Sequence, residues 1–322
     1  MNQIDTKELA ATVAALRQAI QRQLGSIVVG QSRVVDQMFM ALLANGHVLL
    51  EGVPGTAKTT LCRSFSIALG LQFERIQFTP DLLPSDVTGT QVLDRQTSNF
   101  VLRKGPIFCQ LLLADELNRA PARTQSSLLE AMQERQVTIE GKTLALPNPF
   151  LVLATQNPIE QEGVYRLPEA QLDRFLFKVH VGYPGRDEEI AMLQLHSKPI
   201  TAAKPICDAQ IIREIQNGVE SIYCSNEIYE YIIDLVRKSR SHPDLVLGAS
   251  PRAAISILKG ARVHALVAGR DFVTHDDVQN ILVPVLGHRL IMKPESEMDG
   301  ETIERVIESL IKSIPVVAQS KR

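Results

Sequence analysis

The chain has 322 residues, a formal net charge of −2 at pH 7, 5% aromatic residues and no tryptophan. This length is sufficient for two domains with sizeable hydrophobic cores. Because the net charge is close to zero and aromatic rings are scarce, the chain lacks both a broad basic field and a set of base-stacking platforms, and we expect no nucleic-acid partner.

The cysteines and the hydropathy pattern restrict the cellular compartment. Four cysteines are scattered without the C-x-x-C spacing of redox or zinc motifs, so we expect reduced thiols and no structural zinc. No apolar run approaches the length of a membrane span, and residues 1–24 lack the apolar stretch of a signal peptide. These features predict a cytoplasmic protein without a membrane span.

Residues 6–24 are predicted to form an amphipathic helix. Its apolar positions recur at helical spacing and would share one face: Leu9, Val13, Leu16 and Ile20. The sequence Val29-Gly30-Gln31 follows and precedes a second helix that should end near Asn45. Gly30 and Gln31 place backbone groups at a helix start, where a ligand could bind, and a plain turn between two helices is the alternative.

The segment Glu51–Thr60, with the sequence EGVPGTAKTT, has the pattern of a loop that binds nucleotide phosphates. A short apolar strand precedes it and a helical run follows. Glycines let successive backbone N–H groups point inward, and the helix start adds its dipole, so the loop is predicted to bind anions. The predicted nucleotide-binding residues are Gly52, Val53, Pro54, Gly55, Thr56, Ala57, Lys58, Thr59 and Thr60.

Three residues of this loop have individual predictions. Lys58 should contact the β- and γ-phosphates of ATP, and Thr59 should offer its hydroxyl to Mg²⁺. Ala57 stands where the strict pattern has glycine. Alanine is acceptable there if the residue has helical dihedral angles, which need no positive φ, and we therefore expect that conformation.

Strand and helix patterns alternate up to about residue 180, which is typical of a doubly wound α/β fold with a parallel sheet. Five strands are predicted, over residues 47–51, 73–77, 110–115, 150–155 and 175–180. Two β-hairpins are predicted as insertions, one within residues 88–108 and the other within residues 137–146, with its turn at 140–142.

Two carboxylates end the predicted strand that begins near Leu111. Ligands collect at the carboxyl ends of parallel strands, so Asp115 is predicted to hold Mg²⁺ through water, and Glu116 to orient or polarise an attacking water. A strand that simply continues into a polar loop is the alternative. Together with Lys58 and Thr59, the pair would supply both the phosphate clamp and the metal carboxylate that phosphoryl hydrolysis needs.

The next predicted strand, residues 150–155, is followed by Gln156-Asn157-Pro158. An amide at a strand end can hydrogen-bond both a γ-phosphate and the attacking water, which makes Asn157 a candidate catalytic residue. The alternative is an asparagine in an ordinary turn before proline.

Beyond residue 185 the β-rich runs end and helical periodicity dominates. We therefore predict two domains: a nucleotide-binding α/β core with the N-terminal helix, residues 1–185, and a smaller all-α lid, residues 186–322. Within the lid, Ser250 suits a helix N-cap and Pro251 the first helical position. Arg252 is then a cation placed against the helix dipole, which suggests an anionic partner such as a γ-phosphate, with a surface salt bridge as the alternative.

Four motifs occur in an order that resembles the MoxR family of AAA+ ATPases: GVPGTAKT, LLLADELNRAPARTQSSLLEAMQERQVT, ATQNPIEQEG and LPEAQLDRF. The similarity extends over roughly residues 5–315, and family members also carry alanine at the position of Ala57. The resemblance implies a P-loop AAA+ core with hairpin insertions of the family's subgroup and a lid. It also implies that Gly30 and Gln31 lie against the adenine and that Arg252 is a second sensor.

The resemblance further implies a Mg²⁺-dependent ATPase that self-associates into a ring, expected to be a hexamer. Arg174 stands just before the last strand, where AAA+ proteins present an arginine finger to the next subunit; a local pair of Asp173 with Arg174 is the alternative. Hydrolysis would drive remodelling or maturation of a client protein, and the client or adaptor would carry a von Willebrand factor A domain. Arg119 and Arg123 are further interface candidates.

Two other functions remain open at this point. A magnesium-chelatase-like motor subunit would share the fold, but the segments ADELNRAP and EAQLDRF favour the MoxR type. The other is a nucleotide-binding scaffold with negligible hydrolysis, although such a protein would not need Glu116, Asn157 and Arg174.

Overall fold

The computed structural model describes residues 5–53, 55–157, 165, 167–196 and 202–315. Contacts within the chain define two compact units, which are described separately. We call Leu16–Glu214 the core unit, and Met1–Ala15 together with Ile215–Arg322 the helical unit. Within the described residues, every helix is too short or too polar to span a lipid bilayer.

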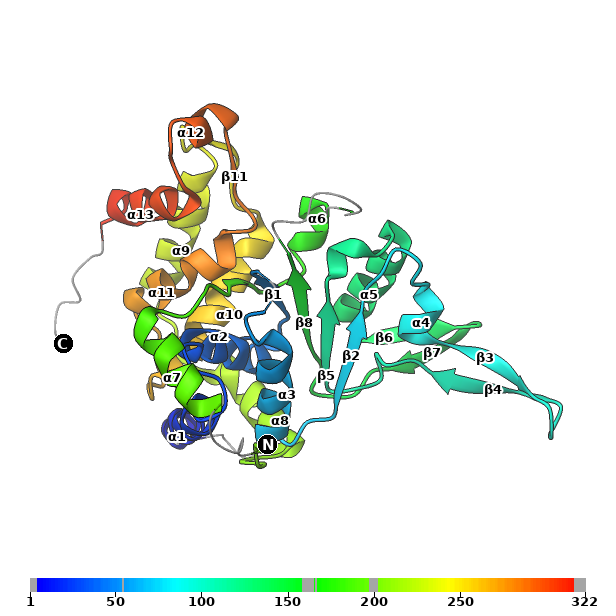
Figure 1. The fold of residues 1–322 in the computed structure, drawn as a ribbon. Helices are drawn as coiled ribbons and strands as arrows, with labels where there is room; N and C mark the ends of the chain where they lie inside the picture. Colours follow the sequence, from blue (N-terminus) through cyan, green and yellow to red (C-terminus); the bar gives the residue numbers. More distant parts are fainter. Residues whose placement is uncertain (1–4, 54, 158–164, 166, 197–201, 316–322) are drawn as a thin grey trace. The chain divides into compact units, whose positions relative to one another are not determined.

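A parallel five-stranded sheet organises the core unit, in the order β2-β5-β8-β1-β9 (Figure 1). All neighbouring strands run parallel. Strands β5, β8 and β1 lie in the middle and are apolar runs, because both faces of such a sheet are covered. The five predicted strands are confirmed as β1 (Val48–Glu51), β2 (Phe73–Gln77), β5 (Leu111–Asp115), β8 (Leu151–Gln156) and β9 (Phe177–His180).

Helices cover both faces of this sheet, as expected for a doubly wound fold (Figure 1). On one face, Leu128 and Met132 of α5 belong to the same buried cluster as Leu112 of β5 and Val152 of β8. The helix α3 contacts β2 and β5, and α2 contacts β9. The helices of the core unit are α2 (Ser32–Leu43), α3 (Lys58–Ala68), α4 (Pro84–Thr88), η1 (Leu117–Arg119), α5 (Ala122–Glu134), α6 (Glu169–Leu172) and α7 (Arg186–His196), and α1 (Thr6–Gly25) and α8 (Ala209–Gly218) contribute to both units.

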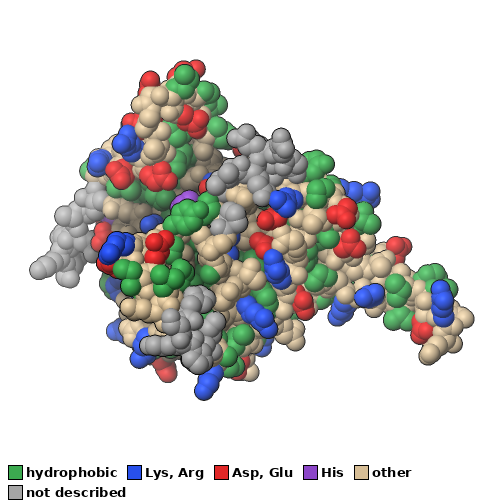
Figure 2. Space-filling view, in the orientation of Figure 1, with side chains coloured by type: hydrophobic (Ala, Val, Ile, Leu, Met, Phe, Trp, Pro, Cys, Tyr) green, Lys and Arg blue, Asp and Glu red, His purple; other side chains and the backbone are tan. Residues whose placement is uncertain are grey.

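Two β-hairpins interrupt the alternation of strands and helices, as predicted. β3 (Gly89–Asp94) pairs with β4 (Asn99–Lys104), and β6 (Gln136–Ile139) pairs with β7 (Lys142–Ala145). The second hairpin turns at Glu140 and Gly141, whose φ angles are 47° and 75°, as tight two-residue hairpin turns require. Apolar side chains are exposed near the free end of the first hairpin (Figure 2): Val92, Leu93, Phe100 and Val101.

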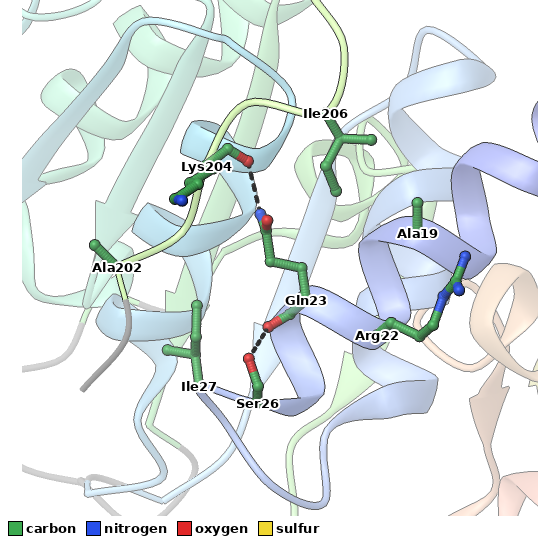
Figure 3. A pocket seen from close by; sticks show the side chains of 8 residues that line it. All are labelled: Ala19, Arg22, Gln23, Ser26, Ile27, Ala202, Lys204 and Ile206. Carbon is green, nitrogen blue, oxygen red and sulfur yellow. Dashed lines mark hydrogen bonds between the residues drawn. The ribbon is translucent and has the colours of Figure 1, made fainter. Parts of the chain in front are cut away.

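The segment after α7 belongs to the core unit, which extends to Glu214. The backbone N–H of Ile206 donates to Ala68 O (2.7 Å), and Gln23 Nε2 donates to Lys204 O (2.7 Å; Figure 3). These bonds attach the segment to α3 and to the end of α1. Both bonds join residues far apart in the sequence, and no hydropathy pattern reveals such pairs.

The helical unit confirms the predicted helical lid and adds one short antiparallel β pair. Its long helices are α9 (Asn226–Ser239), α10 (Pro251–Val267), α11 (His275–Leu286) and α13 (Ile303–Ser313). The shorter elements are η2 (Val219–Ser221), β10 (Leu245–Leu247), β11 (Ile291–Met292) and α12 (Pro294–Met298). The β10–β11 pair was not predicted, because strands of three and two residues are too short to show an alternating pattern.

A buried carboxylate joins two helices of this unit. Asp277, near the start of α11, accepts hydrogen bonds from His264 of α10 (2.6 Å) and from Arg270 (2.5 and 2.7 Å). It also accepts the backbone N–H (2.7 Å) and the hydroxyl (2.8 Å) of Thr274, the N-cap of α11. Burial alone would raise the pKa of this carboxyl group, but the donors outweigh burial and hold the pKa of Asp277 well below its usual range.

Replacing Asp277 with asparagine should lower the free energy of unfolding by about 3 kcal/mol, because Arg270 keeps its charge but loses its partner. A carboxyl group with a lowered native pKa stabilises the fold above its unfolded-state pKa, about 3.9, and this contribution is lost as the pH falls below that value. Urea unfolding followed by circular dichroism should therefore separate the variant clearly from the wild type near pH 7. The difference should shrink toward about pH 3.

Asp276→Asn is the matched control, since Asp276 is exposed on the same first turn of α11. It should lower the free energy of unfolding by less than about 1 kcal/mol, the usual size of a helix-dipole contribution. Equal losses for Asp276→Asn and Asp277→Asn would contradict the role given to the buried cluster.

Candidate functional site

The predicted phosphate loop joins β1 to α3. Gly52 lies so close to the end of β9 that a Cβ atom there would be 2.3 Å from the carbonyl oxygen of Val181. Gly55 has a φ of +85°, a conformation that suits glycine. One glycine therefore permits a close approach of two chain segments, and the other permits the turn. Pro54, also predicted to bind nucleotide, lies outside the described residues.

Ala57 does not have the helical conformation that we predicted. Its φ and ψ are 56° and 22°, in the left-handed region. Ala57 is the N-cap of α3, and its carbonyl accepts the N–H of Leu61 (2.9 Å). The loop reverses direction immediately before the helix, and closing that turn requires a left-handed residue, although this conformation costs a residue with a Cβ atom about 1 kcal/mol.

Lys58 points back into the loop. Its ammonium group donates to Gly52 O (2.5 Å) and to Val53 O (3.1 Å). Partial burial lowers the pKa of Lys58, while the nearby carboxylates of Asp115 and Glu116 act in the opposite direction. An anion bound in the loop would offset the effect of burial, so the geometry suits a phosphate group at this point.

Asp115 and Glu116 stand opposite the loop, at the carboxyl end of β5. Thr155 of the neighbouring strand β8 donates its hydroxyl to Asp115 Oδ1 (2.6 Å) and accepts the backbone N–H of Glu116 (2.8 Å). Glu116 has a φ of 56°, an uncommon conformation for a residue with a side chain. The Thr155 hydroxyl thus holds the point where the chain turns out of the sheet.

Side chains from β2 contact both carboxylates. Arg75 forms a salt bridge with Asp115 (2.8 Å), and Gln77 Nε2 donates to Glu116 Oε2 (2.7 Å). Arg119, a predicted interface candidate, pairs with Glu116 of its own chain (3.2 Å). Arg75 and Gln77 were not predicted as site residues. Their polar side chains at alternate positions were the available signal, but only the strand order places β2 beside β5.

A cavity of about 330 Å³ lies between the phosphate loop and the ends of β5 and β8. Its lining residues are Gly52, Gly55, Thr56, Ala57, Lys58, Thr59, Thr60, Asp115, Glu116, Thr155, Gln156 and Asn157. The cavity therefore brings together the described residues predicted for the phosphates, except Val53, with those predicted for the metal and, in Glu116 and Asn157, for water activation. Thr155 and Gln156 are lining residues that were not predicted.

Four described residues that were predicted to bind nucleotide or to act in catalysis belong to the core unit but do not line this cavity: Val53, Gly30, Gln31 and Arg174. The carbonyl oxygen of Val53 accepts the ammonium group of Lys58. Gly30 (φ +79°) packs so closely against Glu188 that a Cβ atom would lie 2.7 Å from its carboxylate oxygen. Gln31 is buried and is the N-cap of α2. Arg174 donates from Nη1 to Leu129 O (2.8 Å), which holds the guanidinium on α5.

Arg252 belongs to the helical unit. Ser250 Oγ accepts the N–H of Ala253 (3.2 Å) and Pro251 is the first residue of α10, which confirms the predicted helix start. Contact of Arg252 with a γ-phosphate stays a prediction.

The cavity suits Mg²⁺ as an ion shared with a nucleotide. Among the described residues, no group of three or more His, Cys, Asp or Glu side chains could hold a metal ion by itself. Thr59 and Asp115 offer one hydroxyl and one carboxylate in the same cavity. Mg²⁺ is typically bound by such a small set of hard oxygen ligands, completed by phosphate oxygens and water.

Comparisons with known proteins identify the family. Residues 47–177 match the family described as "ATPase family associated with various cellular activities (AAA)", and residues 237–310 match "AAA lid domain". Chaperone MoxR1 of Mycobacterium tuberculosis is 44% identical over 95% of this chain and 83% of its own length. Protein MoxR of Paracoccus denitrificans is 30% identical over 92% of this chain and 94% of its own length. The chain belongs to the MoxR family of AAA+ ATPases.

A solved structure supports the same conclusion. The crystal structure of a candidate ATPase from Cytophaga hutchinsonii has a TM-score of 0.89 and 39% identity, over 96% of this chain and 97% of that one. This MoxR-family protein is therefore an ATPase with an AAA+ α/β core and a helical lid, as the sequence predicts.

Lys58→Ala should weaken ATP binding by about 10- to 100-fold, because it removes a hydrogen bond from a charged donor to the phosphates. Titration with a fluorescent ATP analogue would measure the loss. Arg63→Ala is the control, since it removes an exposed cation from the same helix α3. If both variants bind as the wild type does, Lys58 has no role in binding phosphate.

Glu116→Gln should bind ATP with nearly wild-type affinity and hydrolyse it about 10²- to 10⁴-fold more slowly, because an amide cannot accept a proton from the attacking water. Phosphate release in a single turnover would measure the chemical step separately from product release. Turnover close to the wild-type rate would remove Glu116 from the catalytic role.

Proposed function

We propose that this MoxR-family ATPase works as a hexameric ring and hydrolyses Mg²⁺-bound ATP between neighbouring subunits. The observation that carries the proposal is the shortage of cations in the cavity: Lys58 is the one cation among the described residues that line it, beside the carboxylates of Asp115 and Glu116. The transition state of phosphoryl transfer spreads negative charge over the phosphoryl oxygens, and an arginine usually stabilises it. Arg174 of the next subunit would supply this charge, and Asn157 would orient the attacking water with Glu116.

The contacts of Arg174 support this role. In the described part of the chain, only Nη1 has a hydrogen-bond partner, Leu129 O, and the side chain is half-buried beside α5. A guanidinium has five N–H donors, and its planar shape allows it to bind two phosphate oxygens at once. Arg174 is thus held at one point while other donors remain for an anion. From the lid, Arg252 would act as the second sensor of the γ-phosphate.

Hydrolysis would drive the remodelling or maturation of a client protein in the cytoplasm. One relative is named a chaperone. The exposed apolar end of the β3–β4 hairpin, which includes Leu93 and Phe100, offers a surface for a polypeptide. The family resemblance favours a client or adaptor with a von Willebrand factor A domain. A cytoplasmic location agrees with four free cysteines.

Mixed rings test the position of Arg174 and the assembly together. Arg174→Ala alone should bind ATP and hydrolyse it roughly 10³- to 10⁵-fold more slowly. Glu116→Gln alone should also be inactive. When the two variants exchange subunits, some interfaces join an intact Glu116 to an intact Arg174 of the neighbour, so ATPase activity should partly return in a phosphate-release assay.

The control mixture combines Glu116→Gln with a double variant that carries both Glu116→Gln and Arg174→Ala. No interface in this mixture contains an intact Glu116, so activity should stay absent. Subunit exchange would be verified by energy transfer between labelled subunits. If the first mixture remains inactive after its subunits have exchanged, the assignment of Arg174 to the neighbouring subunit's site is wrong.

A further inference from the structure

Asp115 is already engaged at both carboxylate oxygens. Oδ1 accepts the Thr155 hydroxyl (2.6 Å), and Oδ2 accepts two N–H groups of Arg75, from Nη2 (2.8 Å) and Nε (3.2 Å). An oxygen has two lone pairs, so the guanidinium uses the full acceptor capacity of Oδ2. Arg75 is therefore the counter-ion of the carboxylate that lines the cavity beside Thr59.

The sheet register explains why Arg75 reaches this carboxylate. Gln77 lies directly beside Asp115 on the neighbouring strand, and Arg75 lies two positions earlier, beside Leu113. Side chains two positions apart on a strand share one face, so Arg75 and Asp115 are diagonal neighbours on the same side of the sheet. A long side chain can bridge this diagonal, whereas a short one cannot.

Arg75 can also leave Asp115 without disturbing the core. It belongs to β2, the edge strand of the sheet, and its side chain is 44% exposed. Its Nη2 also donates to Gln77 Oε1 (2.7 Å), which gives the guanidinium a second acceptor on its own strand. Water and Gln77 could therefore satisfy the donors once the ion pair is broken.

We propose that Arg75 neutralises Asp115 in the nucleotide-free protein and that Mg²⁺ displaces it when ATP binds. A guanidinium and a divalent cation repel each other, and the two N–H groups of Arg75 leave no lone pair of Oδ2 for a magnesium-bound water, so Arg75 and hydrated Mg²⁺ compete for Asp115. Arg75 thereby sets the Mg²⁺ concentration at which nucleotide binds tightly. The inference rests on the proposed Mg²⁺-dependent function of this site. The size of the effect follows from the exposure of the pair: a partly exposed ion pair changes an equilibrium by about 1.5- to 5-fold.

Nucleotide binding as a function of Mg²⁺ tests this competition without relying on turnover. The affinity for a fluorescent ADP analogue is measured in EDTA and over a Mg²⁺ titration. Arg75→Gln should lower the Mg²⁺ concentration at which the change in nucleotide affinity is half-maximal by about 1.5- to 5-fold. Arg75→Lys should give a smaller shift, because lysine keeps the charge but lacks the paired N–H donors of the guanidinium. Arg63→Gln, which removes an exposed cation from α3, should leave this concentration unchanged. Thermal melts would verify that each variant is folded.

A double-mutant cycle distinguishes displacement of Arg75 from Asp115 from a general change in the electrostatic potential of the cavity. In an Asp115→Asn background there is no carboxylate to neutralise, so adding Arg75→Gln should leave the Mg²⁺ requirement of that background unchanged. An equal shift in both backgrounds would overturn the inference, as would an unchanged or higher Mg²⁺ requirement in Arg75→Gln alone. A higher requirement would mean that Arg75 orients Asp115 for the metal. If the nucleotide affinity of the wild-type protein does not depend on Mg²⁺, this result would contradict the proposed function itself.

Discussion

The parallel register of β5 and β8 is the constraint on which the site depends. Ala114 lies beside Ala154, so the two strands end together and Thr155 reaches Asp115. One hydroxyl then binds a carboxylate on one side and the backbone of Glu116 on the other. A shift of one residue would turn Thr155 to the opposite face of the sheet and separate these groups.

The second feature of the site is its balance of charge before any nucleotide binds. Asp115 and Glu116 place two carboxylates where a chain of phosphates must also fit. Three cations from different elements offset them: Lys58 from α3, Arg75 from β2 and Arg119 from η1. Because the charges are already partnered, binding of a nucleotide with the proposed Mg²⁺ would exchange one set of partners for another and would leave no carboxylate alone in the cavity.

The phosphate loop shows that the intrinsic preference of one residue can give the wrong backbone conformation. Alanine avoids positive φ in isolation, which led to the expectation of a helical Ala57. The conformation is instead decided by closure of the loop between β1 and α3, which needs a left-handed residue before Lys58. The general pattern has glycine at this position, which correctly indicates a left-handed backbone conformation. In this chain an alanine adopts that conformation.

The sequence by itself determined the five strands of the parallel sheet, both hairpins, the phosphate loop and the family, because these follow from hydrophobic periodicity, glycine placement and the order of motifs. It also singled out Asp115 and Glu116, since strand ends of a parallel sheet meet at one edge. Only the tertiary structure decided that Arg75 and Gln77 face these carboxylates, and that the segment around Ile206 belongs to the core unit. Strand order and backbone bonds between distant segments produce these contacts, and neither leaves a periodic signal in the sequence.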